Sequence, residues 1–260
     1  MHNSPWFSAI ERPKAAERRL FCLPHAGGGT AAFHRWKPLL PDTIELVTIK
    51  LPGREDRFEE APYEDLDTLA RKIAQEIEPL VVEPEQEGGC RYAIFGHSMG
   101  AAIAYRTIVH LARNNSPRPT VLFVSACRSP TAFRDDPPLH TLEDQAMLEG
   151  LINRYGATNG TDAQSSGELE MMRLMAKTIR ADLKMLETYK HDDAPPIECD
   201  IFALGGTDDP QVTRGDLQRW QDLTAAKFST RMFPGHHFYL RNQEKAVVKT
   251  VVSRFGSIAR

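Results

Sequence analysis

The chain has 260 residues, of which 41% are hydrophobic, and its formal net charge at pH 7 is −3. This length and apolar content are enough for one domain over residues 1–260, and the lack of excess basic charge argues against a nucleic-acid partner. The four cysteines are scattered without a C-x-x-C pair, and no apolar run approaches the ~18 residues of a membrane helix. We therefore expect a cytoplasmic, monomeric enzyme without a membrane segment.

Apolar runs that are typical of strands alternate with segments of helical spacing. The expected strands cover residues 19–24, 44–50, the run that ends at 97, 120–126, 199–205 and 228–233. The expected helices cover residues 30–36, 65–82, the segment after 98 as far as 114, 215–224 and 242–258. Because several strands are apolar throughout, the alternation predicts an α/β fold whose mostly parallel sheet is covered by helices on both sides.

The alternation stops between residues 129 and 191, where no strand is expected. Apolar residues recur there every three or four positions and predict one long amphipathic face, made of Leu169, Met172, Ala176, Ile179, Leu183 and Leu186. We interpret residues 129–191 as a helical insertion that serves as a lid. Its methionines, Met172 and Met175 among them, are flexible and suit a pocket for acyl chains of different shape. Ordinary packing of the insertion onto the body is the alternative interpretation.

A G-x-S-x-G motif, Gly96 to Gly100, stands between an apolar strand and an Ala-rich helical segment. In α/β-hydrolases a nucleophilic serine occupies a strained strand-to-helix turn, where glycines on both sides let the neighbouring backbone pass. Ser98 is therefore the predicted nucleophile.

A serine nucleophile needs a base and an acid, which follow it along the chain in the order acid and then histidine. Asp208 and Asp209 follow one expected strand, and His236 and His237 follow the last one. We predict Asp209 as the acid, because it stands at the tip of its turn, where Asp208 would bind turn amides. We predict His237 as the base, with His236 and Asp208 as the fallback choices.

Backbone amides would stabilise the tetrahedral oxyanion of acyl transfer. Met99 follows the nucleophile, and Ala26 lies in the loop from His25 to Gly29, so these two amides are the predicted oxyanion hole. The same loop lacks the P-loop and dinucleotide-binding motifs, and no H-E-x-x-H pattern occurs. We therefore expect no bound metal or nucleotide, and we expect His25, Gly27, Met172 and Met175 to contact the substrate.

Five segments together resemble the type II thioesterases, the editing hydrolases of polyketide and nonribosomal peptide synthesis. They are FCLPHAGG at 21–28, LPGRE at 51–55 with Arg57 and Phe58, GHSMG at 96–100, GTDDP at 206–210 and GHHFYL at 235–240. The resemblance implies an α/β-hydrolase with a mobile helical lid, and it maps the nucleophile, acid and base onto Ser98, Asp209 and His237. One departure is His236, where a glycine is more usual.

The resemblance also implies a substrate and a partner. The family cleaves acyl groups from the 4'-phosphopantetheine arm of acyl or peptidyl carrier proteins, and the enzyme itself binds no cofactor. Carrier proteins of this kind present an acidic surface, and the cationic residues expected to meet it are Lys177, Arg180 and Lys184 in the insertion and Arg54 and Arg57 after the second strand. A solvated helix face is the plainer interpretation of the first three.

Two other functions are compatible with the same residues. A small-molecule carboxylesterase or lipase-like hydrolase would use the same triad, and a non-catalytic binding protein could share the fold. The second alternative is disfavoured because a binding protein would have no reason to retain the complete set of site residues.

Overall fold

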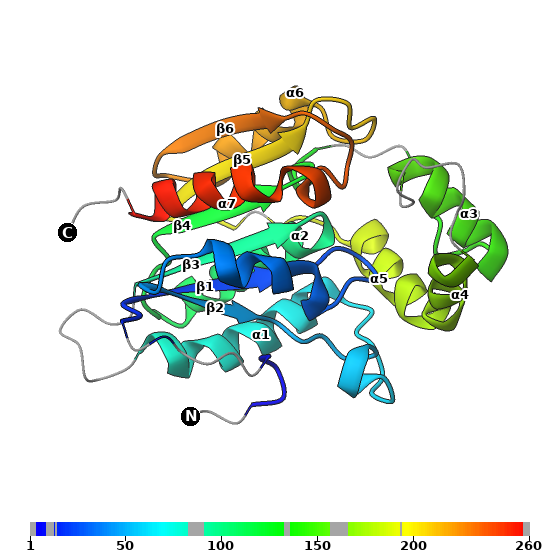
Figure 1. Ribbon diagram of the computed structural model, residues 1–260, viewed down its shortest axis with the longest axis horizontal. Coiled ribbons are helices and arrows are strands. Elements are labelled where there is room, and N and C mark those ends of the chain that lie inside the picture. The colour runs from blue at the N-terminus through cyan, green and yellow to red at the C-terminus, as the bar shows by residue number, and fades with distance from the viewer. Residues whose placement is uncertain are drawn as a thin grey trace.

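A computed structural model describes residues 4–8, 13, 15–82, 91–132, 136–156, 166–192 and 194–256. Six strands form one sheet in the order β2-β1-β3-β4-β5-β6, and every neighbouring pair is parallel (Figure 1). The strands are β1 (Arg18–Leu23), β2 (Ile44–Thr48), β3 (Arg91–His97), β4 (Val121–Ser125), β5 (Asp200–Gly206) and β6 (Phe228–Phe233). The expected alternation of strands and helices and the parallel sheet are confirmed.

Helices cover both faces of the sheet, as expected from strands that are buried on both sides. The α-helices of the body are α1 (Leu66–Val81), α2 (Met99–Arg113), α6 (Arg214–Gln218) and α7 (Leu240–Gly256), and the 3-10 helices are η1 (Thr30–Leu39), η2 (Glu55–Arg57) and η3 (Arg219–Leu223). One buried core joins α1, α2 and η3 to the sheet, and a second joins η1 and α7 to the opposite face.

Two expected helices differ in type from the structure. The segment after the first strand is the 3-10 helix η1, which contains Pro38. Proline cannot donate the backbone hydrogen bond that a regular α-helix needs at that position. The expected helix over 215–224 is the short α6 followed by η3.

In the described parts of the chain between β4 and β5, three further helices gather at one end of the molecule (Figure 1). They are α3 (Asp144–Tyr155), α4 (Ser166–Leu174) and α5 (Ala176–Thr188). The predicted amphipathic face is divided between α4 and α5, because Met175 has ψ 7° and leaves helical geometry. Helix α4 contacts α3, whereas α5 contacts both α3 and α2 of the body. The sequence has no glycine or proline at this break, so tertiary packing decides it.

The strand order places a candidate site between β1 and β3. The chain runs from β1 to β2 on one side and then returns to β3 on the other side of β1, so the direction of strand addition reverses there. Ligands of open α/β sheets bind outside the carboxyl ends of the strands at such a point. Among the described helices, none is both long and apolar enough to cross a membrane.

Candidate active site

Ser98 stands in a sharp turn between β3 and α2. Its backbone has φ 52° and ψ −118°, a conformation that costs a non-glycine residue energy. The two flanking glycines make the turn possible: a side chain on Gly96 would overlap the backbone of Gly100, and one on Gly100 would overlap the backbone of Leu23. The turn leaves Ser98 partly exposed at the carboxyl edge of the sheet.

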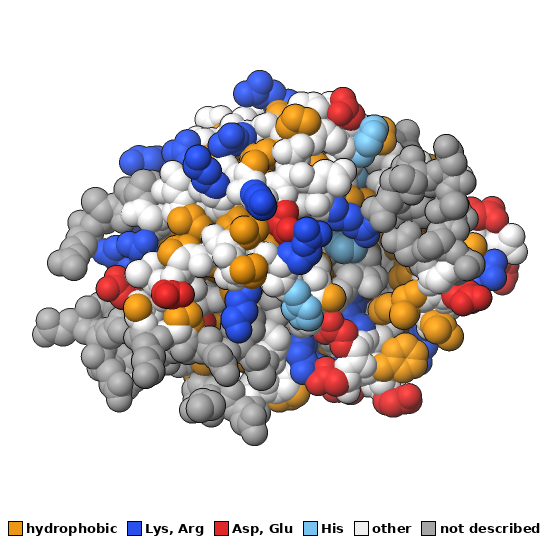
Figure 2. Space-filling view, viewed as in Figure 1, with side chains coloured by type: hydrophobic (Ala, Val, Ile, Leu, Met, Phe, Trp, Pro, Cys, Tyr) orange, Lys and Arg blue, Asp and Glu red, His pale blue; other side chains and the backbone are white. Residues whose placement is uncertain are grey.

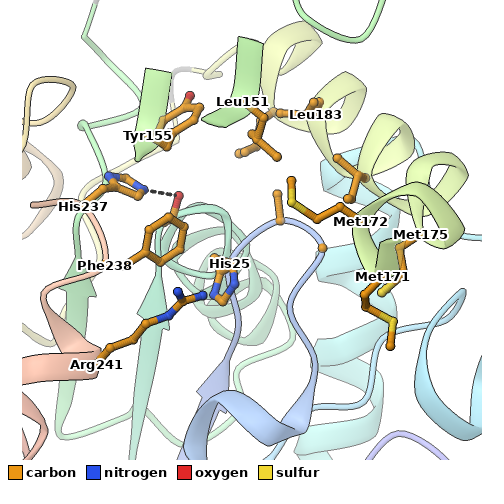
Figure 3. Close-up of a pocket in the computed structure, with 15 residues that line it drawn as sticks. His25, Leu151, Tyr155, Met171, Met172, Met175, Leu183, His237, Phe238 and Arg241 are labelled. Atoms are coloured by element: carbon orange, nitrogen blue, oxygen red, sulfur yellow. Dashed lines mark hydrogen bonds between the residues drawn. The ribbon is translucent and has the colours of Figure 1, made fainter. Parts of the chain in front are cut away.

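Three side chains from separate loops form one hydrogen-bonded chain. His237 Nδ1 lies 2.8 Å from Asp209 Oδ2, and His237 Nε2 lies 3.0 Å from Ser98 Oγ (Figure 3). A carboxylate can only accept, so Nδ1 donates to Asp209 and Nε2 is left to accept from the serine hydroxyl. The other carboxylate oxygen, Oδ1, accepts from the amides of Gln211 and Val212 at 2.8 and 3.2 Å. This arrangement can remove the proton from Ser98 as its oxygen attacks a carbonyl.

Asp208 and His236, the residues next to Asp209 and His237, make contacts different from those of the triad. Asp208 Oδ2 accepts from the amide of Gly235 at 3.2 Å, and His236 Nδ1 donates to the carbonyl oxygen of Asp208 at 2.8 Å. Asp208 and His236 therefore tie the loop after β5 to the loop after β6. The structure brings Ser98 together with Asp209 and His237, and it gives Asp208 and His236 this connecting position.

The two amides predicted to form the oxyanion hole belong to Met99, which follows Ser98, and to Ala26, which lines the same cavity as Ser98. Met99 is the first residue of α2, so its amide has no partner within the helix. Ala26 lies in a turn closed by the hydrogen bond from Gly28 N to His25 O at 2.9 Å, and Gly27 in that turn has φ +71°. A positive φ at the third residue is the signature of a type II turn. We call residues 25–28 the oxyanion turn.

A buried ion pair joins the oxyanion turn to α5. Asp182 Oδ2 accepts from the amide of Gly27 at 2.8 Å, and both carboxylate oxygens of Asp182 accept from Arg54, at 3.0 and 2.8 Å. Arg54 also donates to the carbonyl oxygen of Gly28 at 2.9 Å. Both charged side chains are only 2% exposed. The expectation that Arg54 faces a partner protein is therefore wrong.

The other cations expected at a docking surface are also engaged within the chain, with one exception. Arg57 is 7% exposed and pairs with Glu60. Arg180 pairs with Asp144, and Lys184 pairs with Glu64. Lys177 is exposed. The expected cationic surface fails because local carboxylates neutralise most of it.

A cavity of about 210 Å³ opens beside Ser98 and His237. The four residues expected to contact substrate, His25, Gly27, Met172 and Met175, all line it, together with Ala26, Leu151, Tyr155, Met171, Ile179, Leu183, Leu186, Phe238 and Arg241. Figure 3 shows the methionines on the side of the insertion, with His25, Phe238 and Arg241 across the cavity. The insertion thus provides an apolar wall that faces the polar triad.

A second polar chain lies beneath the triad. His97 Nδ1 lies 2.9 Å from Ser125 Oγ, and this oxygen lies 2.7 Å from the hydroxyl of Tyr239. Burial holds the pKa of His97 well below its ordinary value, with His237 and His25 adding to the effect. Burial, followed by the charge of Arg241, lowers the pKa of His25 to about 3. Both imidazoles are therefore neutral at neutral pH.

Several residues of the site were missed by sequence reasoning. Tyr155, whose ring centroid lies 4.9 Å from that of His237, ends a helix with no motif around it. Asp182 did carry a signal, because it is a carboxylate three residues after Ile179 and four before Leu186, on the apolar face of its helix. Within the described residues, no group of three or more His, Cys, Asp or Glu side chains could hold a metal ion.

Comparison with known proteins identifies relatives of nearly the whole chain. The model of the thioesterase domain family matches residues 18–255. The gramicidin S biosynthesis protein GrsT of Aneurinibacillus migulanus is 34% identical over 244 residues, which are 94% of this chain and 91% of that protein. Thioesterase PikA5 of Streptomyces venezuelae is 36% identical over 238 residues, with 92% and 81% coverage.

Solved structures agree with these relatives. The type II thioesterase BorB from the borrelidin biosynthetic cluster is 29% identical, with a TM-score of 0.86 and coverage of 98% of this chain and 99% of that one. The RedJ thioesterase of the prodiginine pathway in Streptomyces coelicolor is 34% identical, with a TM-score of 0.82 and coverage of 95% and 90%. The predicted α/β-hydrolase fold and the resemblance to type II thioesterases are confirmed.

Proposed function

Since the chain belongs to the thioesterase family, we propose that it hydrolyses acyl groups from the phosphopantetheine arm of a carrier protein through a Ser98 acyl-enzyme. The hydrogen-bonded chain from Asp209 through His237 to Ser98, at the edge of an apolar cavity, is the observation that supports this proposal most directly. The similarity to the gramicidin S biosynthesis protein GrsT and to the type II thioesterase BorB of the borrelidin biosynthetic cluster supports the choice of a carrier-bound substrate.

In the first half of the reaction Ser98 Oγ attacks the thioester carbonyl while His237 Nε2 takes its proton. Asp209 holds the imidazole in the required tautomer and stabilises its positive charge. The amides of Ala26 and Met99 stabilise the oxyanion, and each donor of this kind contributes about 3 to 4 kcal/mol. The carbon–sulfur bond then breaks, and His237 returns its proton to the departing pantetheine thiolate.

In the second half a water molecule replaces the thiol. His237 takes a proton from the water as its oxygen attacks the ester carbonyl of the acyl-enzyme, and it then protonates Ser98 Oγ as the free acid leaves. The wall formed by Met172, Met175 and Leu183 would receive the acyl chain, because flexible methionines adapt to different shapes.

Exposed cations on α7 would meet the carrier protein. Lys245 and Lys249 are exposed and four residues apart in the part of α7 that follows the non-helical residue Gln243, so they share one face. Arg241 is also exposed and precedes Gln243. Arg241 also lines the cavity. Figure 2 shows Lys and Arg side chains gathered over α7. A positive surface that begins at the cavity suits a partner whose arm is attached to it through an anionic phosphodiester.

The principal test compares three substrates: an acyl-carrier protein, the same acyl group on N-acetylcysteamine, and a simple aryl ester. We expect kcat/KM to be highest for the carrier protein and lowest for the aryl ester. Trapped wild-type enzyme should gain the mass of the acyl group on the peptide that contains Ser98. A preference for the aryl ester over both thioesters would favour the carboxylesterase instead.

The partner is tested by charge reversal on α7. Lys245→Glu with Lys249→Glu should raise KM for the acyl-carrier protein several-fold, and the difference should shrink at high salt. Lys177→Glu, an exposed cation of the insertion, serves as the matched control. If Lys177→Glu raises KM and the α7 variant does not, the carrier protein docks on the insertion and not on α7.

A further inference from the structure

The oxyanion turn is held by a charged side chain that belongs to the helical insertion. Asp182 is part of α5, 155 positions away from Gly27, yet its carboxylate accepts the Gly27 amide hydrogen at 2.8 Å. The carboxylate is in turn fixed by two hydrogen bonds from Arg54, which follows β2. A carboxylate and a guanidinium at 2% exposure have lost their hydration, and here they form hydrogen bonds with each other and with the turn instead.

The position of this contact controls the shape of the turn. Type I and type II turns differ by a flip of the central peptide, which here is the peptide between Ala26 and Gly27. Asp182 accepts the N–H of that peptide, so it favours the type II form and opposes the flip. Arg54 fixes the next peptide by donating to the carbonyl oxygen of Gly28 at 2.9 Å.

Helix α5 also supplies the wall of the acyl cavity. Ile179, Leu183 and Leu186 line the cavity from the same helix that carries Asp182. Ile179 packs so closely on the turn that a side chain on Gly27 would lie 2.9 Å from its Cγ1. The acyl wall and the oxyanion turn are thus parts of one packed unit.

From this geometry we infer that Asp182 and Arg54 are positioning residues for catalysis: they fix the peptides that follow Ala26 and so keep the oxyanion turn, with the Ala26 amide, in place beside Ser98 when α5 is packed against the turn. The inference rests on the proposed serine mechanism. It assigns to the ion pair a contribution to transition-state stabilisation, which a buried pair that only stabilises the fold does not make.

The test replaces both charges at once, with Arg54→Met and Asp182→Leu in one variant. Removing a single partner would leave a buried charge uncompensated, whereas apolar replacement of both partners is far better tolerated. Arg54→Met with Asp182→Asn is the conservative variant, because it also removes both charges while the amide oxygen of the asparagine can still accept from Gly27. Thr178→Val is the matched control: Thr178 also joins α5 to a loop, by a buried bond to the Gly53 carbonyl oxygen at 2.6 Å, but this bond lies outside the oxyanion turn.

Two measurements separate a positioning role from a structural one. We expect kcat on an acyl N-acetylcysteamine thioester to fall about 10- to 100-fold in the double variant, with KM within about twofold of wild type. Affinity for an alkyl trifluoromethyl ketone, whose adduct with Ser98 places an oxyanion in the hole, should fall by the same factor. Affinity for the matching fatty acid should stay constant. Arg54→Met with Asp182→Asn should show a smaller loss than Arg54→Met with Asp182→Leu, and Thr178→Val should show none.

Other results would overturn the inference. Unchanged kcat in a folded double variant would do so, as would equal losses of affinity for the ketone and the fatty acid. A Thr178→Val variant that matches the double variant would show that any loosening of α5 has the same effect. Failure of wild-type enzyme to bind the ketone would refute the serine mechanism itself, so the two failures are distinguishable. If this double variant does not fold, Arg54→Met with Asp182→Asn supplies the comparison at smaller size: its affinity for the ketone should still fall more than its affinity for the fatty acid.

Discussion

The strained backbone at Ser98 predicts that the active site reduces the stability of the fold. We expect Ser98→Gly to be more stable than Ser98→Ala, although neither variant keeps the hydroxyl that the proposed mechanism requires. Both variants lose the hydroxyl and its hydrogen bond to His237, so that loss cancels in the comparison. What remains is the backbone conformation, φ 52° and ψ −118°, which glycine adopts far more readily than alanine.

The size of the effect follows from two opposing terms. A non-glycine residue held in a sparsely populated region costs about 1 to 3 kcal/mol, and glycine removes this cost. Glycine also gains freedom in the unfolded chain, which costs the folded state about 0.5 to 1 kcal/mol. The strain term is the larger, so the free energy of unfolding of Ser98→Gly should exceed that of Ser98→Ala by about 0.5 to 2 kcal/mol. In a chain of this length each kcal/mol corresponds to about 2 to 4 °C in Tm.

Calorimetry and guanidinium titration of the two variants measure this difference. Asn115→Gly is the matched control, because Asn115 has φ 57° and is exposed, and asparagine tolerates left-handed geometry at low cost. Asn115→Gly should raise the free energy of unfolding by less than the difference in unfolding free energy between the two Ser98 variants. A glycine variant no more stable than the alanine variant would refute the argument that the turn stores strain.

The remaining predictions concern the triad and the neutral histidines. Asp209→Asn should lower kcat about 10⁴-fold, whereas Asp208→Asn should have a small effect on kcat in steady-state assays. His237→Ala should abolish turnover and His236→Ala should not; a larger loss at position 236 would reverse the assignment of the base. Because the folded pKa of His25 is depressed to about 3, its unfolded form binds the proton first, so stability falls as pH drops below about 6.5. In urea titrations, His25→Gln should therefore reduce the fall in unfolding free energy between pH 6.5 and pH 4. If the unfolding free energy of the variant falls as steeply with pH as that of wild type, the pKa of His25 is not depressed.

Residue patterns within each segment were sufficient to predict the strands and helices of the body of the fold. Strand and helix periodicity along the chain fixed the alternation, because each element buries one face or both against its neighbours. The nucleophile turn was also readable, because Gly96 and Gly100 are both required by close backbone approach around Ser98. The contact between Gly96 and Gly100 is local, whereas Gly100 also approaches the backbone of Leu23, so for this glycine the motif and not local geometry carried the prediction.

Choices between adjacent residues needed the tertiary structure. Asp208 and Asp209 differ by one position, and only the arrangement of the loops after β5 and β6 decides which carboxylate meets His237. The sequence suggested an order of preference, but pattern alone gives no distance between loops 28 positions apart. The break at Met175 is of the same kind, since it reflects how α4 and α5 pack on different neighbours.

Charge was the property that sequence reasoning interpreted least well. The sequence predicts Arg54 to be a surface cation in a polar loop, yet the fold buries it against Asp182, which is 128 positions away. Spacing within one segment predicts which side chains share a face, because helix and strand geometry are local. Whether a charge on that face meets water, a partner or an opposite charge depends on contacts between distant segments, and only the folded chain determines those.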